Sequence, residues 1–478
     1  MAAKTHSELR RGLISALMAS LSGNLLASIL MGVAVIVLPK FVPMETYGTW
    51  QAYVLYTTYL GYLTFGLAEG YYVRHSGEEI RHINKTEVTG QLAVTVLLLL
   101  VVLVPSAVLV KMFSDTSTFL IVGWAMLTTM LYVPRVYLCY VFQSVNRMWV
   151  FARAFIIERM VFLLLACVAV VSHNVEAWLL LLCDTIGRLM GLLFTLWKAR
   201  KHLLGRIQRS QIDTHRLGQT FKAGLSLNLA ALAAVLLTAI PRFAVERFES
   251  VDVFGQVAFV FSLVALFQTV ASAVSNAILP SLRRAGHDRY NALYARSSNY
   301  LGLLTVALTP LVGVMVLFVR WWLPTLTMLP ALVLVIFPIL YFESRSRIVS
   351  TPFLQAIRDE KYIAGANVIP LLLCLLGVSY AVWQGLSVML MVVCIPVAVA
   401  LRAFLLAART DQKFAGRSLP QVFCECLLSL AMVMIALNTE DQRWWAVLIV
   451  VWLAVMGVET LGIRRGQGKG KGASDAHN

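Results

Sequence analysis

Leu21-Ser22-Gly23-Asn24-Leu25 returns 204 residues later as Leu225-Ser226-Leu227-Asn228-Leu229. Each stretch lies in an apolar run that ends in proline, a basic residue and phenylalanine, first as Pro39-Lys40-Phe41 and then as Pro241-Arg242-Phe243. Asparagine and proline are uncommon within leucine-rich runs, so their recurrence at matching places predicts an internal duplication.

Two further matches follow in the same order. Tyr47-Gly48 corresponds to Phe254-Gly255, and Phe142-Gln143-Ser144-Val145 corresponds to Leu354-Gln355-Ala356-Ile357. The offset grows slowly, from 204 at the asparagine to 212 at the glutamine, as small changes in loop length would produce. We therefore expect two halves that run in the same direction through a membrane, related by an axis along its normal.

The composition is that of a protein that lies in a membrane. Of the 478 residues, 59% are hydrophobic and 13% are charged, whereas soluble domains are about 25% charged. The mean hydropathy is +0.78. We predict an all-α integral membrane protein, because fourteen segments approach the ~20 apolar residues that a spanning helix needs. They are Gly12–Leu38, Tyr47–Gly66, Val88–Val110, Phe119–Val141, Val150–Val171, Ala177–Trp197, Phe221–Pro241, Val253–Ala277, Asn299–Val319, Thr325–Phe342, Tyr362–Trp383, Gly385–Leu401, Leu419–Leu437 and Trp444–Ile463.

The net charge of +16 reflects topology. Most of the 40 Lys and Arg fall on alternate connections, which the positive-inside rule assigns to the cytoplasm together with both termini. We predict an N-terminal six-helix half (residues 1–197), a basic cytoplasmic linker (198–220), a second six-helix half (221–408), and two extra helices with a basic tail (409–478). We expect the protein to contact the lipid bilayer and not to bind nucleic acid.

The repeated motifs resemble those of a known family. A span that ends in Pro39-Lys40-Phe41, followed by Tyr47-Gly48 and by a helix closing on Gly66-Leu67, is similar to the polysaccharide transporters of the multidrug/oligosaccharidyl-lipid/polysaccharide superfamily. The second half repeats this signature. The resemblance implies a Wzx-type flippase of the bacterial inner membrane, which translocates undecaprenyl-diphosphate-linked O-antigen, exopolysaccharide or capsule units. It also implies that glycan polymerase or export proteins work beside a monomeric transport unit.

Charged residues inside the spans are the candidate site. Such groups are costly in a bilayer and usually face a cavity or a partner. We expect Arg135, Arg159 and Arg188 to border a central cavity, because guanidinium groups bind phosphate by paired, charge-assisted hydrogen bonds. The corresponding helices of the second half are expected to hold no cation. The remaining candidates are Arg153, Asn24 and Asn228, followed by Glu158, Asp184, Lys222, Gln268 and Asn276.

Some alternatives stay open at this point. Asp184 and Arg188 are four residues apart and could form an ion pair within one helix. A MATE-like cation or drug antiporter should place a carboxylate in the first or seventh span, and neither contains Asp or Glu. A glycan polymerase or ligase is a third reading, but the loops are short and no catalytic or nucleotide-binding motif is present. We therefore expect a transporter rather than an enzyme, without cofactor or metal, coupled to membrane potential, H+ or Na+.

Overall fold

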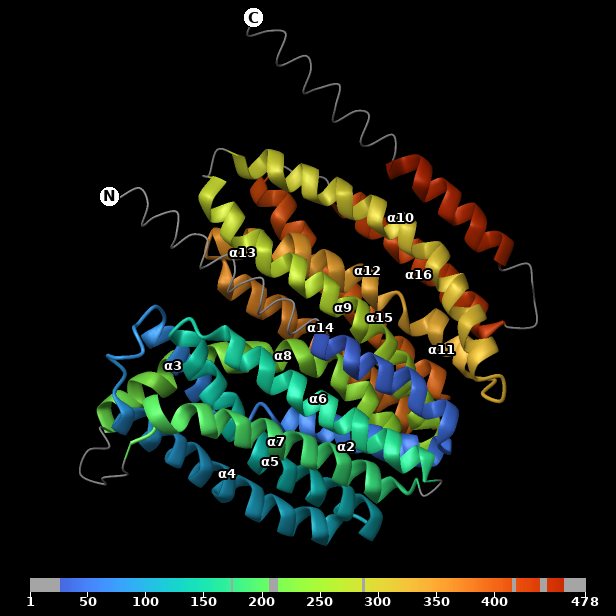
Figure 1. The fold of residues 1–478 in the computed structure, drawn as a ribbon. Coiled ribbons are helices and arrows are strands. Elements are labelled where there is room, and N and C mark those ends of the chain that lie inside the picture. Colours follow the sequence, from blue (N-terminus) through green and yellow to red (C-terminus); the bar gives the residue numbers. More distant parts are fainter. Residues whose placement is uncertain are drawn as a thin grey trace, which may run out of the picture. The chain divides into compact units, whose positions relative to one another are not determined.

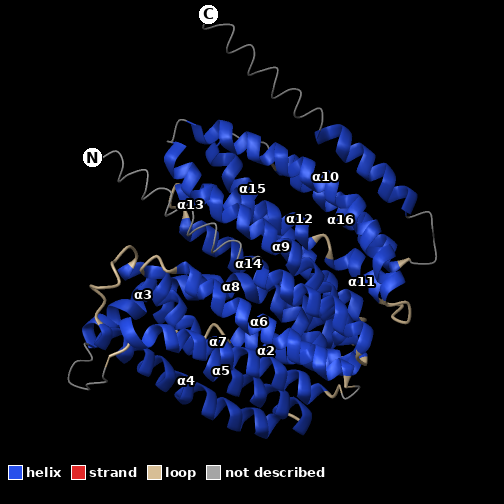
Figure 2. Cartoon of the chain, in the orientation of Figure 1, coloured by secondary structure: helices blue, strands red, loops and turns tan. Residues whose placement is uncertain are grey.

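The computed structural model describes residues 26–172, 175–205, 214–285, 289–414, 418–438 and 445–459. Within these ranges the chain is built of α-helices joined by loops, with one π-helical segment and no β-strand (Figure 2). Ten of the helices described are long and apolar enough to cross a membrane. They correspond to predicted spans three to nine and eleven to thirteen. Spans one and fourteen are described as the shorter apolar helices Leu26–Phe41 and Trp445–Glu459.

The contacts within the chain divide it into two compact units, Met1–Leu232 and Ala233–Asn478. The division falls inside α8 (Thr214–Phe248). α7 extends to His202 and α8 starts at Thr214, so helix occupies much of the segment 198–220 that the sequence presents as a linker.

The first unit surrounds α5. Its helices after Leu26–Phe41 are α2 (Met44–Leu60), α3 (Leu67–His75), α4 (Lys85–Phe113), α5 (Thr116–Ser144), α6 (Met148–Val171) and α7 (Ala177–His202). α5 contacts α2, α3, α4, α6 and α7, and α6 and α7 run side by side (Figure 1). Tyr71, Tyr137 and Phe142 are the large buried side chains where α3, α4, α5 and α7 meet.

The second unit surrounds a broken helix. It contains α9 (Val251–Ala285), α10 (Tyr290–Trp322), α11 (Leu329–Ile336), α12 (Ile339–Ser344), the π-helix η3 (Arg345–Ser350), α13 (Thr351–Ala356), α14 (Glu360–Trp383), α15 (Val388–Phe414) and α16 (Leu419–Leu437). The run from α11 to α13 packs against α9, α10, α15 and α16. Tyr294, Phe353 and Phe414 form an aromatic cluster, with ring centroids 5.3–5.6 Å apart, at the end of this run.

Two predicted spans differ from the structure. The second, Tyr47–Gly66, is interrupted: α2 ends at Leu60, and the chain turns through Gly66, at a φ of 75°, before α3 begins. Glycine adopts this left-handed conformation without steric cost. The tenth, Thr325–Phe342, breaks before Pro338 and then continues well past Phe342 to Ala356. Glu343, which directly follows the predicted end, is buried and paired with Arg402, as described below.

α3 and α8 touch through their backbones. A Cβ atom added at Gly224 of α8 would lie 1.8 Å from the carbonyl oxygen of Gly66, and one at Gly70 would lie 1.9 Å from the carbonyl oxygen of Thr220. Small residues four apart on each helix are typical of close helix crossings in membranes. Only glycine at Gly66, Gly70 and Gly224 permits this approach, so the contact fixes the short helix that follows the break.

A polar cluster next to this crossing fastens the same two helices. Arg74 of α3 donates to the Arg216 carbonyl oxygen on α8, at 2.9 Å, and lies 3.8 Å from Glu87 of α4. His75 Nε2 lies 3.4 Å from Glu87 Oε1. The Glu87 carboxylate beside its ring raises the pKa of His75 above its usual value. The stabilising charge on His75 is therefore fully present below pH ~6.5 and is lost as the pH rises through the raised pKa.

The glycine contact predicts a sharp difference between two substitutions on α8. Gly224→Ala should destabilise the protein by about 3 kcal/mol, because its methyl group meets rigid backbone rather than a movable side chain. Gly218→Ala is the matched control, since a Cβ there has no neighbour within 4 Å and alanine favours helix by up to about 1 kcal/mol. Thermal unfolding of the purified variants measures the difference; equal midpoints for the two would contradict the contact.

Candidate functional site

Five charged side chains form a continuous network inside the first unit. Arg135 Nη1 of α5 lies 2.6 Å from Glu158 Oε2 of α6, and Glu158 Oε1 lies 3.4 Å from Arg159 Nη2. Arg159 Nη1 lies 3.6 Å from Asp184 Oδ1 of α7, whose Oδ2 accepts from Arg188 Nε at 2.7 Å. The signs alternate along the network, so each carboxylate is flanked by two guanidinium groups and only one positive charge is left over.

Glycines on α7 bring the network together. A Cβ at Gly187 would lie 2.6 Å from the Glu158 carbonyl oxygen, and one at Gly191 would lie 3.2 Å from that of Ala154. α6 and α7 therefore approach closely at the level of Glu158, Arg159 and Asp184. α2 adds a neutral donor, because the Tyr53 hydroxyl donates to Asp184 Oδ2 at 2.8 Å.

Arg135 is the structural member of the network. Its side chain is fully buried, as is that of Glu158. The guanidinium carbon also lies 4.3 Å from the ring centroid of Phe155 and 5.2 Å from that of Tyr132, where an aromatic face attracts a cation. Arg135 is not among the residues that line the cavities described below.

Arg159 and Arg188 do border a cavity. It measures about 270 Å³, and its wall includes Thr57, Thr58 and Tyr62 from α2 and the turn that follows it. Tyr132 and Tyr140 of α5 complete its aromatic side. We call this space the arginine cavity. Its lining combines guanidinium groups, hydroxyl groups and aromatic rings.

The same cavity contains a carboxylate that the sequence analysis missed. Glu69 lies in the first turn of α3, and its Oε2 accepts from the Thr64 hydroxyl at 3.0 Å. Asn228 of α8 donates to Thr64 Oγ1 at 2.8 Å and to Glu69 Oε1 at 3.4 Å. The hydropathy pattern had placed Glu69 in a cytoplasmic segment; the available signal was the pair Gly61 and Gly66, which marks the break before α3.

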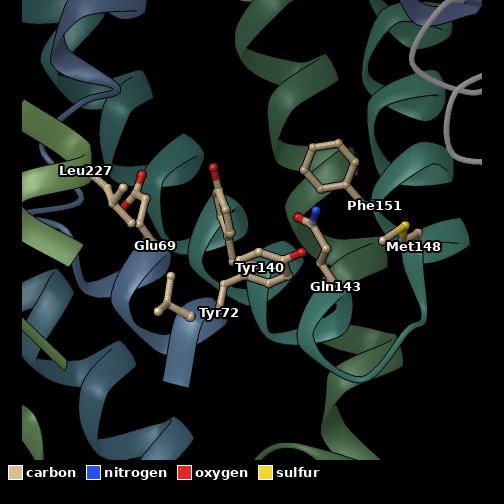
Figure 3. Close-up of a pocket in the computed structure, with 8 residues that line it drawn as sticks. Glu69, Tyr72, Tyr140, Gln143, Met148, Phe151 and Leu227 are labelled. Atoms are coloured by element: carbon tan, nitrogen blue, oxygen red, sulfur yellow. The ribbon is translucent and has the colours of Figure 1, made fainter. Parts of the chain in front are cut away.

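A second cavity adjoins the first. It measures about 440 Å³ and shares Glu69 and Tyr140 with the arginine cavity. Figure 3 shows Glu69 and Leu227 on one side and Gln143, Met148 and Phe151 on the other, with Tyr72 and Tyr140 between them. The two spaces together extend from the charge network to the turn between α5 and α6.

Of the other predicted site residues, those that the structure describes line neither of these cavities. Arg153 and Lys222 have exposed side chains, and the Arg153 guanidinium lies over the Trp149 ring. Gln268 is half-buried on α9, outside both cavities. Asn24, and the side chain of Asn276, fall outside the residues that the structure describes.

The helices of the second unit that correspond to predicted spans ten and twelve also contain buried cations, although these spans were expected to hold none. Arg345 of η3 is fully buried and lies 2.6 Å from Glu425 of α16. Gln421 accepts from Arg345 and donates to Glu459 at 2.8 Å, so Gln421 links the Arg345–Glu425 pair to the helix Trp445–Glu459. Arg402 of α15 pairs with Glu343 at 2.7 Å. Both arginines were missed because they lie just past the predicted ends of spans ten and twelve.

The fold is shared with known transporters. The structure of lipid II flippase MurJ in an inward closed conformation matches 95% of this chain and 99% of its own, with a TM-score of 0.62 and 14% identity. An inward-facing multidrug resistance MATE family transporter of the MOP superfamily matches 90% of this chain and 99% of its own (TM-score 0.61, 10% identity). An outward-facing one matches 84% and 95% (TM-score 0.53, 10% identity). No family model matches the sequence, and no curated protein matches it.

Breaking the buried pair in the network should be costly. Glu158→Leu leaves Arg135 as a buried charge without a carboxylate and should destabilise the protein by about 3–5 kcal/mol, whereas Arg135→Met leaves Glu158 only its longer contact with Arg159 and should cost less. The double variant should recover most of this loss, because neither charge then remains. Arg153→Gln is the control, since Arg153 is exposed. Thermal unfolding of the four variants tests the pairing, and an Arg135→Met protein as stable as the wild type would refute it.

Proposed function

We propose that this protein is a flippase that moves polyprenyl-diphosphate-linked oligosaccharides across the bacterial inner membrane by alternating access. The observation that carries the proposal is the pair Arg159 and Arg188 on the wall of the arginine cavity. A lipid diphosphate must keep its negative charge while crossing a medium of low polarity. Arginine supplies a permanent positive charge and a planar set of donors that match phosphate oxygens.

Arg159 is the better placed of the two to bind an incoming anion. Its side chain is 17% exposed, and its ion-pair distances of 3.4 and 3.6 Å are long for charge-assisted hydrogen bonds. Arg188 is held more firmly, because its Nε bonds Asp184 at 2.7 Å. We infer that Arg159 turns toward the diphosphate while Arg188 provides a fixed charge beside it.

The remaining walls suit a glycan. Sugar rings need hydrogen-bonding groups and flat apolar faces, and the two cavities offer Thr57, Thr58 and Gln143 beside Tyr62 and Tyr140. The lipid tail would stay in the bilayer, against apolar helix faces. The proposal includes a monomeric unit coupled to membrane potential, H+ or Na+, working with glycan polymerase or export proteins.

One observation favours a second candidate function. Glu69 lies in the arginine cavity, and a carboxylate in a membrane cavity can bind a proton, Na+ or a cationic drug. A MATE-like cation antiporter is therefore the alternative. Transport of a cationic dye in exchange for protons, abolished by Glu69→Gln, together with no flipping of a lipid-linked glycan, would establish it and would exclude the flippase. A polymerase or ligase has no comparable support.

The flippase proposal predicts a graded loss of transport in reconstituted vesicles. Each charge-assisted hydrogen bond contributes about 1.5–3 kcal/mol, so Arg159→Ala should slow flipping of a lipid-linked oligosaccharide by about 10- to 100-fold. Arg159→Lys should retain part of the activity, because the charge remains without the paired geometry. Arg188→Ala should also reduce transport. Because Asp184 then loses a partner, the thermal stability of this variant must be measured alongside its transport rate.

Arg81→Ala is the matched control, because Arg81 is an exposed arginine of the same unit and borders neither cavity. It should flip substrate at the wild-type rate. Full transport by a folded Arg159→Ala, Arg188→Ala double variant would remove these residues from the mechanism, and an absence of flipping by the wild-type protein would reject the function itself.

A further inference from the structure

We propose that a third cavity, at the end of α5, α6 and α7, binds the phosphate group of an anionic membrane lipid. This basic cavity measures about 260 Å³, and its wall includes Arg147, Trp149, Trp197, Lys198, Arg200 and Lys201. It lies apart from the arginine cavity and shares no lining residue with it. The proposal does not rest on the flippase function.

The charge of this cavity is one-sided. Four cations line it and no carboxylate does. Arg147, Lys198, Arg200 and Lys201 make no ion pair with any carboxylate in the described part of the chain. Like charges gathered without a counter-charge repel one another, so a bound anion would stabilise their arrangement.

Helix capping does not account for the cluster. Basic residues in the last turn of a helix complement its dipole, and α7 ends in such residues. However, Arg147 precedes the first turn of α6, where the dipole disfavours a cation. Lys85 of α4 already donates to the Lys201 carbonyl oxygen at 2.9 Å. A ligand in the cavity explains why cations gather there from two different helix ends.

Aromatic rings hold one of the cations in place. The Lys198 ammonium lies 4.0 Å from the ring centroid of Trp197 and 5.5 Å from that of Trp149. These cation–π contacts hold a flexible side chain, which reduces the entropy lost when it binds a phosphate. The guanidinium carbon of Arg153 lies 4.7 Å from the ring centroid of Trp149, so this ring, which lines the cavity, contacts two cations.

The position of the cavity indicates a lipid rather than a soluble anion. The apolar run of α7 ends at Trp197, and the charges follow it directly. Tryptophan concentrates at the level of lipid headgroups, and basic pockets at this level bind anionic headgroups. Leu193 and Trp197 are 47% and 52% exposed, which leaves an apolar path along α7 for an acyl chain attached to the phosphate.

The experiment compares ligands on the full-length protein in detergent, by native mass spectrometry. The probes are phosphatidylglycerol, phosphatidylcholine and inorganic pyrophosphate. We expect phosphatidylglycerol to bind at least about 100-fold more tightly than phosphatidylcholine. The triple variant Lys198→Gln/Arg200→Gln/Lys201→Gln should bind phosphatidylglycerol about 100-fold more weakly. Each basic residue near an anionic headgroup changes the affinity by about fivefold. Phosphatidylcholine binding should stay unchanged.

The matched control removes the same charge elsewhere. Arg296→Gln/Lys361→Gln/Lys413→Gln replaces three exposed cations of the second unit that make no ion pair with the carboxylates described. It should leave phosphatidylglycerol binding as in the wild type. Equal losses in both triple variants, or none in either, would overturn the site. Binding of inorganic pyrophosphate as tightly as phosphatidylglycerol would overturn the lipid assignment. Because the readout is binding, these outcomes are independent of whether the protein flips glycans.

Discussion

Compensation of buried charge is the constraint on which the first unit depends. An arginine placed among membrane helices is costly unless a carboxylate lies beside it. The unit meets this requirement by alternating signs from Arg135 to Arg188 across three helices. That alternation requires α6 and α7 to approach closely, which Gly187 and Gly191 permit. The glycines, the ion pairs and the helix packing are therefore one arrangement rather than three separate features.

The same constraint separates structural arginines from arginines available to a ligand. Arg135 in the first unit and Arg345 in the second are fully buried against carboxylates and hold helices together. Arg159 is shared between two carboxylates at longer distances and remains partly exposed on a cavity wall. A bound anion can replace part of this weaker pairing at little cost. In our account the network therefore supports both stability and binding, through different members.

Hydropathy was sufficient to predict most of the spans, because ten helices of the structure are long, apolar segments that stand out in the sequence. The pairing of Asp184 with Arg188 could also be predicted from the sequence, because it depends only on a spacing of four residues within one helix. The pairing of Arg135 with Glu158 was not, because it depends on the register between two helices. Glu69 was misplaced because the helix breaks before it, and Arg345 because the helix continues past the predicted end of its span.

The central claim is that the arginine cavity receives an anionic lipid headgroup, and cysteine protection tests it most directly. Thr58, on the wall of this cavity, would be replaced by cysteine in a protein whose seven native cysteines are substituted, reconstituted in nanodiscs. Our account predicts that a polyprenyl diphosphate slows maleimide labelling of Thr58→Cys severalfold, that an uncharged polyprenol does not, and that Ser76→Cys, outside the cavity, reacts equally in all conditions. Labelling of Thr58→Cys at the same rate with and without the diphosphate would contradict it.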